Sequence, residues 1–264
     1  MQTTQSADGI DVTYDRHGDG RPLIMLHGGM APRRYWTPVI PHFEGFGAVV
    51  PQRPGFGTCL DDPEETSADE VIARERDCVR ALVEAVDGDP VLLGHSFGAL
   101  TAIEAATDAA VDAVVAYEPA ILPHGYRERA DLADRMASLI ESGERRKAVK
   151  RYVEQVLHPD GIDDLDAWLA EWPVWPECVE LAEEVVRMNR AVEGYELPDH
   201  LDVDAPTLVM AGTNGPDFLR ESARDAHEAL PHSRFVEFDG VGHSGPAEAP
   251  ERVAAEVEAF LRTR

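Results

Sequence analysis

Short apolar runs alternate with helical patterns along the first half of the chain. Residues 22–26 (PLIML) and 90–94 (PVLLG) are continuous apolar runs, which are typical of strands buried on both faces of a sheet. Residues 68–86 repeat apolar side chains at helical spacing behind Ser67, a residue type that commonly caps helix N-termini. The patterns predict strands at 10–16, 22–26, 46–51, 90–94 and 111–117, and helices at 33–43, 68–86 and 97–107.

The middle of the chain breaks this alternation. From about 121 to 200 apolar residues recur at helical spacing and no strong strand pattern is found. Strand patterns return at 205–212 and 233–238, and each is followed by a helical pattern. The helices predicted after residue 120 are 127–141, 144–157, 162–171, 177–192, 217–230 and 250–262.

Together these elements predict one α/β fold with a mostly parallel sheet and helices on both faces, because parallel strands need crossover helices. We expect residues 1–120 and 201–264 to form the core. Residues 121–200 are expected to form a helical cap inserted between its two parts.

The charge balance is strongly acidic. Fifty Asp and Glu oppose 24 Lys and Arg, for a formal net charge of -26, and Lys147 and Lys150 are the only lysines. Such a surface repels nucleic acid and anionic membranes, so neither is an expected partner. Scarce lysine favours a protein of a high-salt cytoplasm, where screening relieves the repulsion between carboxylates, although a GC-rich genome also replaces Lys by Arg.

Several absences narrow the class of protein. There is no run of 18 or more apolar residues, so no transmembrane helix is expected. The N-terminal MQTTQSADGIDVTYD lacks the basic start and apolar run of a secretory signal. Cys59, Cys78 and Cys178 are widely spaced and odd in number, unlike a disulfide framework or a zinc site. The sequence therefore indicates a cytoplasmic protein without a metal.

The clearest chemical signal is Gly94-His95-Ser96-Phe97-Gly98. It lies between a predicted buried strand and an Ala-rich predicted helix, which is the context of a nucleophile elbow. The turn in such an elbow is tight enough to require glycine neighbours, and it lifts the serine hydroxyl to a helix N-terminus. We therefore predict that Ser96 is a nucleophile.

Two further glycine turns follow predicted strands. His27-Gly28-Gly29-Met30 could supply a backbone N–H from Gly29, which with that of Phe97 would form an oxyanion hole. We interpret His27 as structural.

Gly240-Val241-Gly242-His243 follows the last predicted strand. His243 therefore comes after Ser96 and the candidate acids along the chain, in the order serine, acid, histidine. We predict that His243 is the general base.

With these motifs the sequence resembles the α/β-hydrolase superfamily. The strings HGGMAPRRYW, VVPQRPGFG, GHSFGA, YEPA and GVGHSGPAEAPE resemble one branch of small bacterial and archaeal hydrolases over nearly the whole chain. The resemblance implies a cap over the active site after the sixth strand. Many relatives carry Asp where this chain has Gln52, in a loop that is structural in the family.

The carboxylate that would orient His243 has two candidates. In many relatives an Asp follows the seventh strand, but Gly215 occupies that place here and Asp217 lies two residues later. Glu118 ends the sixth predicted strand, where some superfamily members carry their acid. Glu118 is favoured, because a carboxylate at the end of an apolar strand needs a partner. Pro119 would bias Glu118 toward an extended backbone, and Asp217 could simply begin the 217–230 helix.

These residues predict acyl transfer to water without a metal or organic cofactor. The expected substrate is a small-molecule ester, with thioesters, lactones and amides open. Carbon–carbon bond hydrolysis on the same triad is one alternative. A ligand-binding signalling protein with slow turnover is another. A dehalogenase or epoxide hydrolase is disfavoured, because both families carry Asp where this chain has Ser96.

Overall fold

The structure is a computed structural model that describes residues 1–53, 67–158, 161–172 and 174–263. Cys59 and residues 54–57 of the VVPQRPGFG string lie outside the described residues. Cys78 and Cys178 are buried free thiols. Among the described residues, no helix is both long and apolar enough to cross a membrane.

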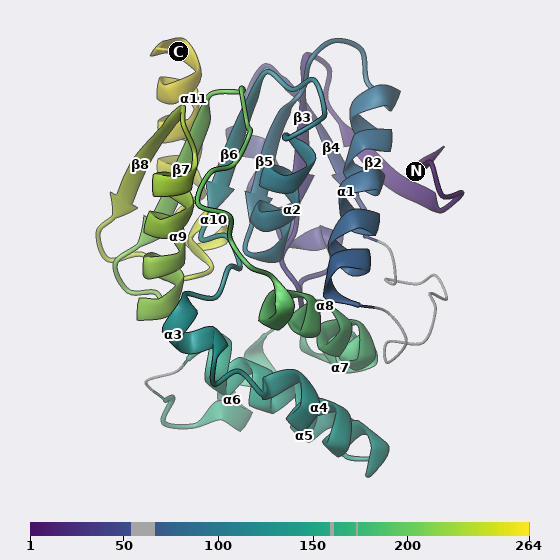
Figure 1. Cartoon of the computed structure of the whole chain (residues 1–264), viewed down its shortest axis with the longest axis vertical. Helices are drawn as coiled ribbons and strands as arrows, with labels where there is room; N and C mark the ends of the chain where they lie inside the picture. Colours follow the sequence, from purple (N-terminus) through teal and green to yellow (C-terminus); the bar gives the residue numbers. More distant parts are fainter. Residues whose placement is uncertain (54–66, 159–160, 173, 264) are drawn as a thin grey trace.

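One eight-stranded sheet forms the centre of the molecule (Figure 1). Its strand order is β1-β2-β4-β3-β5-β6-β7-β8, and all neighbours from β4 to β8 are parallel. β1 and β2 are antiparallel additions at one edge. The strands are β1 Gln2–Gln5, β2 Asp11–His17, β3 Arg21–Leu26, β4 Phe46–Pro51, β5 Val91–His95, β6 Ala113–Tyr117, β7 Thr207–Gly212 and β8 Ser233–Phe238.

Helices cover both faces of the sheet, and alternating strand residues pack against them. Ile24 and Leu92 belong to a core shared with α1, α2 and α9, whereas Leu23 and Leu93 belong to the core of the opposite face with α11. This two-sided burial explains why the central strands read as continuous apolar runs. The covering helices are α1 Ala68–Ala85, α2 Phe97–Ala105, α9 Asp217–Ala229 and α11 Pro250–Thr263.

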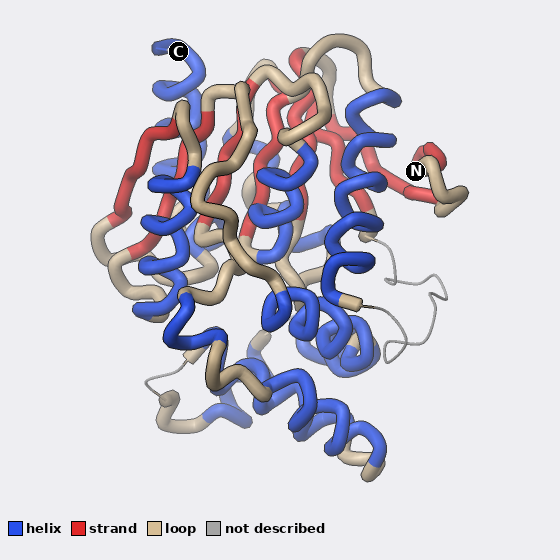
Figure 2. Tube along the Cα trace, in the orientation of Figure 1, coloured by secondary structure: helices blue, strands red, loops and turns tan. Residues whose placement is uncertain are grey.

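A group of helices between β6 and β7, here called the inserted helices, lies beyond the carboxyl ends of the strands (Figures 1 and 2). They have their own apolar core, which includes Met136, Val149 and Trp175 and also takes in Met30 from the loop after β3. Their bounds are α3 His124–Arg127, α4 Leu132–Glu141, α5 Arg145–Tyr152, a π-helical turn Val153–Leu157, α6 Leu165–Glu171, α7 Trp175–Glu180 and α8 Ala182–Gly194.

Helix α8 attaches the inserted helices to the core domain. Met188 and Val192 pack with Phe97 and Leu100 of α2. Phe97 directly follows Ser96, so this contact places α8 beside the predicted nucleophile.

The fold class predicted from the sequence is confirmed, with differences in particular elements. The predicted 33–43 helix is wrong. Two short 3₁₀ turns, Arg33–Trp36 and Ile40–His42, replace it because Pro38 and Pro41 lack the N–H that a continuous helix needs. Strand β1 was not predicted, since its sequence QTTQ has no apolar face. The predicted helices 127–141 and 177–192 are each interrupted, and the last five residues of 144–157 form the π-helical turn.

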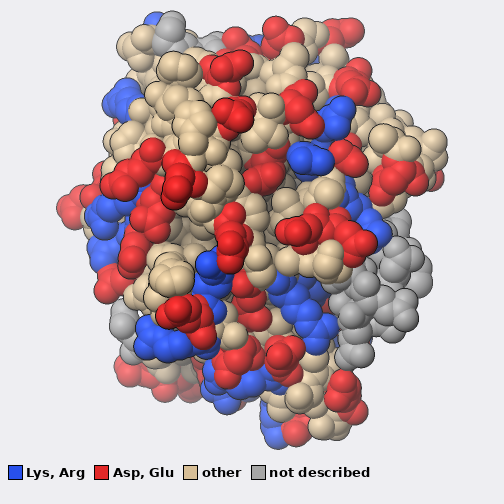
Figure 3. All heavy atoms as spheres, in the orientation of Figure 1, with Lys and Arg blue, Asp and Glu red and all other residues tan. Residues whose placement is uncertain are grey.

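Carboxylates cover much of the face seen in Figure 3, with arginines and lysines scattered among them. Many of the basic groups pair with acidic ones, as in the ion pairs Arg34–Glu177 (2.9 Å) and Arg127–Glu196 (2.8 Å). Since 50 acidic residues stand against 24 Lys and Arg, these ion pairs leave a large excess of negative charge.

Candidate active site

Ser96 lies at the turn from β5 into α2, in a strained backbone conformation. Its φ is +56°, a left-handed value that is uncommon for any residue except glycine. The turn is closely packed, because a Cβ at Gly98 would lie 2.1 Å from the carbonyl oxygen of Leu26. These features give Ser96 the geometry of a nucleophile elbow.

The structure brings Glu118 and His243 together. The Oε2 of Glu118 lies 2.6 Å from the Nδ1 of His243, and both side chains are buried. The other oxygen, Oε1, accepts the backbone N–H of Gly212 at 2.9 Å. Since a carboxylate can only accept, Nδ1 carries the proton and Nε2 is left as the basic nitrogen of the imidazole.

The backbone at Glu118 differs from the expected extended form. Its φ is +43°, and among the described residues only Ser96 and Glu118 combine a side chain with a positive φ. Pro119 disfavours the right-handed helical region for the residue before it, and Glu118 avoids that region through a positive φ instead of an extended backbone. The turn allows the N–H of Ala120 to reach the carbonyl oxygen of Ser96 at 3.1 Å, which joins the two strained segments.

Asp217 lies away from this pair. Its side chain is 80% exposed and forms an ion pair with Arg220 one turn along α9. Gly215, the usual place of the acid, faces the Glu118 carboxylate, since a Cβ there would lie 2.8 Å from Oε1. A side chain at 215 and the present Glu118 would therefore compete for the same space.

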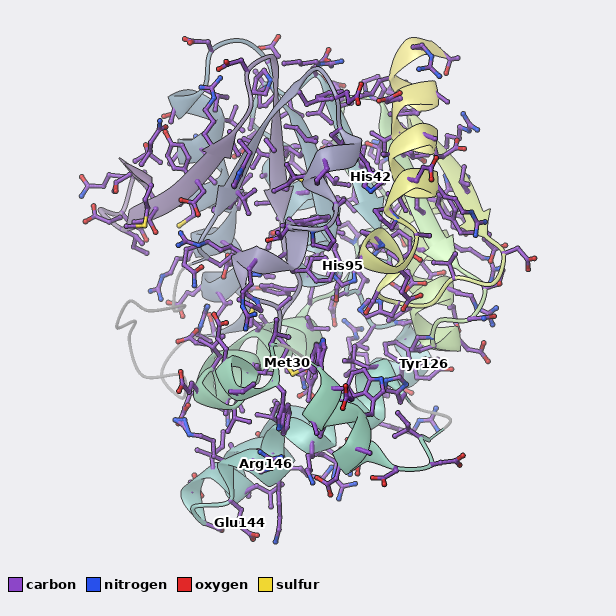
Figure 4. The ribbon with its side chains drawn as sticks, turned by 180° about the vertical axis from the view of Figure 1, so that it is seen from behind. Met30, His42, His95, Tyr126, Glu144 and Arg146 are labelled. Atoms are coloured by element: carbon purple, nitrogen blue, oxygen red, sulfur yellow. The ribbon has the colours of Figure 1, made fainter. Side chains whose placement is uncertain are left out.

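Two buried rings support the loop that carries His243. The Tyr117 hydroxyl donates to the carbonyl oxygen of Gly242 at 2.7 Å, and His95 Nε2 lies 2.9 Å from the carbonyl oxygen of His243. Burial lowers the pKa of His95 well below its usual range, so the ring is neutral and Nε2 is the nitrogen that donates. Figure 4 labels His95 on the side of the sheet and Met30 beside the inserted helices.

The predicted oxyanion donors lie beside Ser96. Gly29 and Phe97 both line the cavity that contains Ser96. Helix α2 begins at Phe97, and the first N–H groups of a helix have no partner within it. His27 is buried, and its Nδ1 lies 3.0 Å from the carbonyl oxygen of Gly28. Burial and the Arg53 charge lower the pKa of His27 to about 3, so it stays neutral.

Arg53, which the sequence analysis did not single out, contacts both parts of the predicted oxyanion hole. Its Nη1 donates to the carbonyl oxygen of His27 at 2.7 Å, and its guanidinium lies 4.4 Å from the centre of the Phe97 ring. Glu75 of α1 neutralises it, with 3.2 Å between Arg53 Nη2 and Glu75 Oε2. Glu75 also pairs with Arg187 of α8 at 3.4 Å, so one buried charge network links the oxyanion loop to the inserted helices.

Two cavities flank Ser96. The first has a volume of about 530 Å³ and extends along the inserted helices to Val192 and Phe218. The second, of about 540 Å³, contains His243 and extends to Trp172 and Met30. Their walls are mostly apolar, which suits organic groups on either side of the serine. Within the described ranges, no three His, Cys, Asp or Glu side chains are placed to share a metal ion.

The structure therefore places Ser96 and His243 on the wall of one cavity, with Glu118 hydrogen-bonded to His243 and with Gly29 and Phe97 lining the other cavity beside Ser96. No hydrogen bond joins Ser96 to His243 among the described residues, although both line the second cavity. Such a set can activate a hydroxyl, attack a carbonyl carbon and stabilise the charge that develops on its oxygen.

Comparison with known proteins supports the family and the fold. A sequence model described as the alpha/beta hydrolase family matches residues 23–256. The chain is 25% identical to (E)-2-((N-methylformamido)methylene)succinate hydrolase from Acinetobacter baylyi, over 99% of this chain and 98% of that protein.

Two solved structures share the fold. An alpha/beta hydrolase from Sphaerobacter thermophilus superposes with a TM-score of 0.78 at 24% identity, covering 98% of this chain and 99% of that one. An esterase from Exiguobacterium antarcticum has a TM-score of 0.78 at 18% identity, covering 99% of both chains. At these identities the structural likeness supports the fold.

Proposed function

Because this chain belongs to the alpha/beta hydrolase family and is an enzyme of the hydrolase class, we propose that it cleaves carboxylic esters or similar acyl bonds of small molecules. The observation that carries this proposal is the 2.6 Å hydrogen bond between Glu118 and His243, beside a serine held at a strained elbow. The relative from Acinetobacter baylyi is named as a hydrolase of a succinate derivative, which also favours a small substrate.

The proposed reaction passes through an acyl-enzyme. Ser96 Oγ attacks the carbonyl carbon while its proton moves to His243 Nε2, and the C=O electron pair moves onto the oxygen. The N–H groups of Gly29 and Phe97 stabilise that oxyanion. Collapse of the intermediate expels the alcohol, which takes the proton from His243. Water then attacks the acyl carbon and gives a proton to His243. The carboxylic acid leaves, and the proton returns from His243 to Ser96 Oγ.

The two cavities receive different parts of the substrate in this proposal. His243 must give its proton to the leaving oxygen, so the alcohol occupies the second cavity, which His243 lines. The acyl group then occupies the first cavity, toward Val192. Residues 121–200 act as a cap in this account, since they supply most of the first cavity's lining.

A panel of p-nitrophenyl esters of graded acyl length tests both the activity and this assignment. We expect wild-type hydrolysis, and we expect Val192→Phe to lower kcat/KM for octanoate relative to acetate by about tenfold, because the larger ring shortens the acyl cavity. The measurement is the ratio of kcat/KM values along the series.

Trp172→Ala is the matched control, because Trp172 lines only the second of the two cavities. It should leave the acyl-length ratio within about twofold of wild type and change the preference among acetates of different alcohols. The reverse result, with Trp172→Ala changing the acyl preference, would contradict the assignment of the cavities.

We also propose that the protein is adapted to a salt-rich cytoplasm, because its net charge is -26 with only two lysines. The melting temperature should then rise steadily from low salt to molar potassium chloride, since screening relieves repulsion between the unpaired carboxylates. Differential scanning fluorimetry over that range measures it. A flat or falling melting temperature would contradict the proposal.

A further inference from the structure

Tyr152 has a position that the proposed mechanism has not used. It is the last residue of α5, and the π-helical turn Val153–Leu157 follows it. Of the described residues, three line both cavities: Gly29, Ser96 and Tyr152. The first two belong to the proposed nucleophile and oxyanion hole, so Tyr152 lies at the place where the reacting carbonyl must sit.

The hydroxyl of Tyr152 faces the oxyanion loop. A Cβ built on Gly29 would lie 3.6 Å from Tyr152 Oη, with the methyl group of Met188 at 3.7 Å beside it. The two side chains therefore cover Gly29 from the side of the inserted helices. A ligand oxygen bound by the Gly29 N–H would lie close to the phenol.

This hydroxyl has no hydrogen-bond partner among the described residues, although the side chain is only 8% exposed. The hydroxyl oxygen itself is not fully enclosed, so from the wall of the two cavities it can bond to water or to a ligand. Burial raises the pKa of Tyr152 to about 12, so the phenol keeps its proton and can donate it in a hydrogen bond.

We propose that Tyr152 is a third oxyanion donor, supplied by the inserted helices, a role that rests on the proposed acyl transfer at Ser96. When Ser96 Oγ bonds to the carbonyl carbon, the C=O electron pair moves to the oxygen, which accepts hydrogen bonds from the N–H groups of Gly29 and Phe97 and from Tyr152 Oη. The phenol keeps its proton throughout. The transferred proton moves from Ser96 to His243 and then to the leaving alcohol.

Tyr152→Phe tests this role, because it removes the hydroxyl and keeps the ring. We expect kcat for a p-nitrophenyl ester to fall about 10- to 100-fold with KM nearly unchanged, since the lost interaction forms fully only in the transition state. The affinity for an arylboronic acid, which forms a tetrahedral adduct with the serine, should fall in parallel. The melting temperature should not fall, because no protein partner loses a hydrogen bond.

Tyr195→Phe is the matched control. Tyr195 is also 8% exposed, but its hydroxyl bonds to the Glu104 carboxylate and it lines neither cavity that flanks Ser96. This variant should lose thermal stability and keep kcat and boronate affinity, the opposite of the result for Tyr152→Phe.

The outcomes separate this inference from the proposed function. Wild-type ester hydrolysis with kcat of Tyr152→Phe within threefold would overturn the role of Tyr152 alone. So would an equal loss of kcat in both tyrosine variants. A wild type that hydrolyses no ester of the panel would overturn the proposed function and this inference with it.

Discussion

Replacing Ser96 by alanine is expected to lower kcat for ester hydrolysis by about a millionfold, the scale measured when the serine nucleophile of subtilisin is removed. The loss is large because no other group can form the acyl intermediate. Ser96 is buried at the elbow, where a smaller side chain removes only the hydroxyl. Steady-state kinetics with the best ester of the panel gives the measurement.

The fold of the Ser96→Ala variant should stay intact. Alanine keeps the Cβ, and the backbone N–H of Ser96 still donates to the carbonyl oxygen of Tyr117 at 2.9 Å. A melting temperature close to that of the wild type therefore accompanies the lost activity. Activity near that of the wild type in a correctly folded variant would rule out Ser96 as nucleophile.

Glu118→Gln is expected to lower kcat by about ten-thousandfold, as for the corresponding Asp-to-Asn change in a serine protease of the trypsin type. The amide keeps the size of the side chain. However, its nitrogen can only donate, and facing His243 it would favour the tautomer with the proton on Nε2. That tautomer cannot accept the proton of Ser96.

Asp217→Asn is the paired control for the acid. Asp217 is exposed and bonded to Arg220, so the change should leave kcat within about twofold of wild type. If Asp217→Asn instead costs orders of magnitude while Glu118→Gln costs little, the acid lies after strand β7 and the assignment of Glu118 is wrong.

The strands were predictable from the sequence because most of them are buried on both faces. β5, β6 and β7 are buried along their whole length, so their sequences carry the apolar runs that sequence patterns detect. β1 has mostly exposed residues and is held by pairing with β2, a relation between distant residues that no local pattern records. For the same reason, the sequence patterns did not predict where the inserted helices are interrupted.

The acid could be narrowed to two residues but not assigned from the sequence. The decisive facts are the pairing of Tyr117 with Met210, which places β6 and β7 in register, and the positive φ of Glu118. Together they bring the Glu118 carboxylate to the Gly212 N–H and to His243. The bond between Gly212 and Glu118 joins residues 94 positions apart in the sequence, which no local pattern records.

The sequence did not indicate a site role for Arg53 or Tyr152, for different reasons. Tyr152 lies on the buried side of an amphipathic helix, where the pattern predicts that a tyrosine belongs to the hydrophobic core. The role of Arg53 comes from two contacts, with the His27 carbonyl and the Phe97 ring, that exist only once the chain is folded. Arg53 falls in the VVPQRPGFG string, whose loop the resemblance indicates to be structural, and Tyr152 belongs to no motif.

Trapping the acyl-enzyme tests the central claim most directly. Rapid quenching during turnover of a p-nitrophenyl ester, followed by peptide mapping with mass spectrometry, identifies any residue that carries the acyl group. The account predicts at most one acyl group per chain, carried on the peptide that contains Ser96, and none in Ser96→Ala. Labelling by an organophosphate without ester turnover would favour the slow ligand-binding protein. Ester turnover with the acyl group on another residue would contradict the claim that Ser96 is the nucleophile.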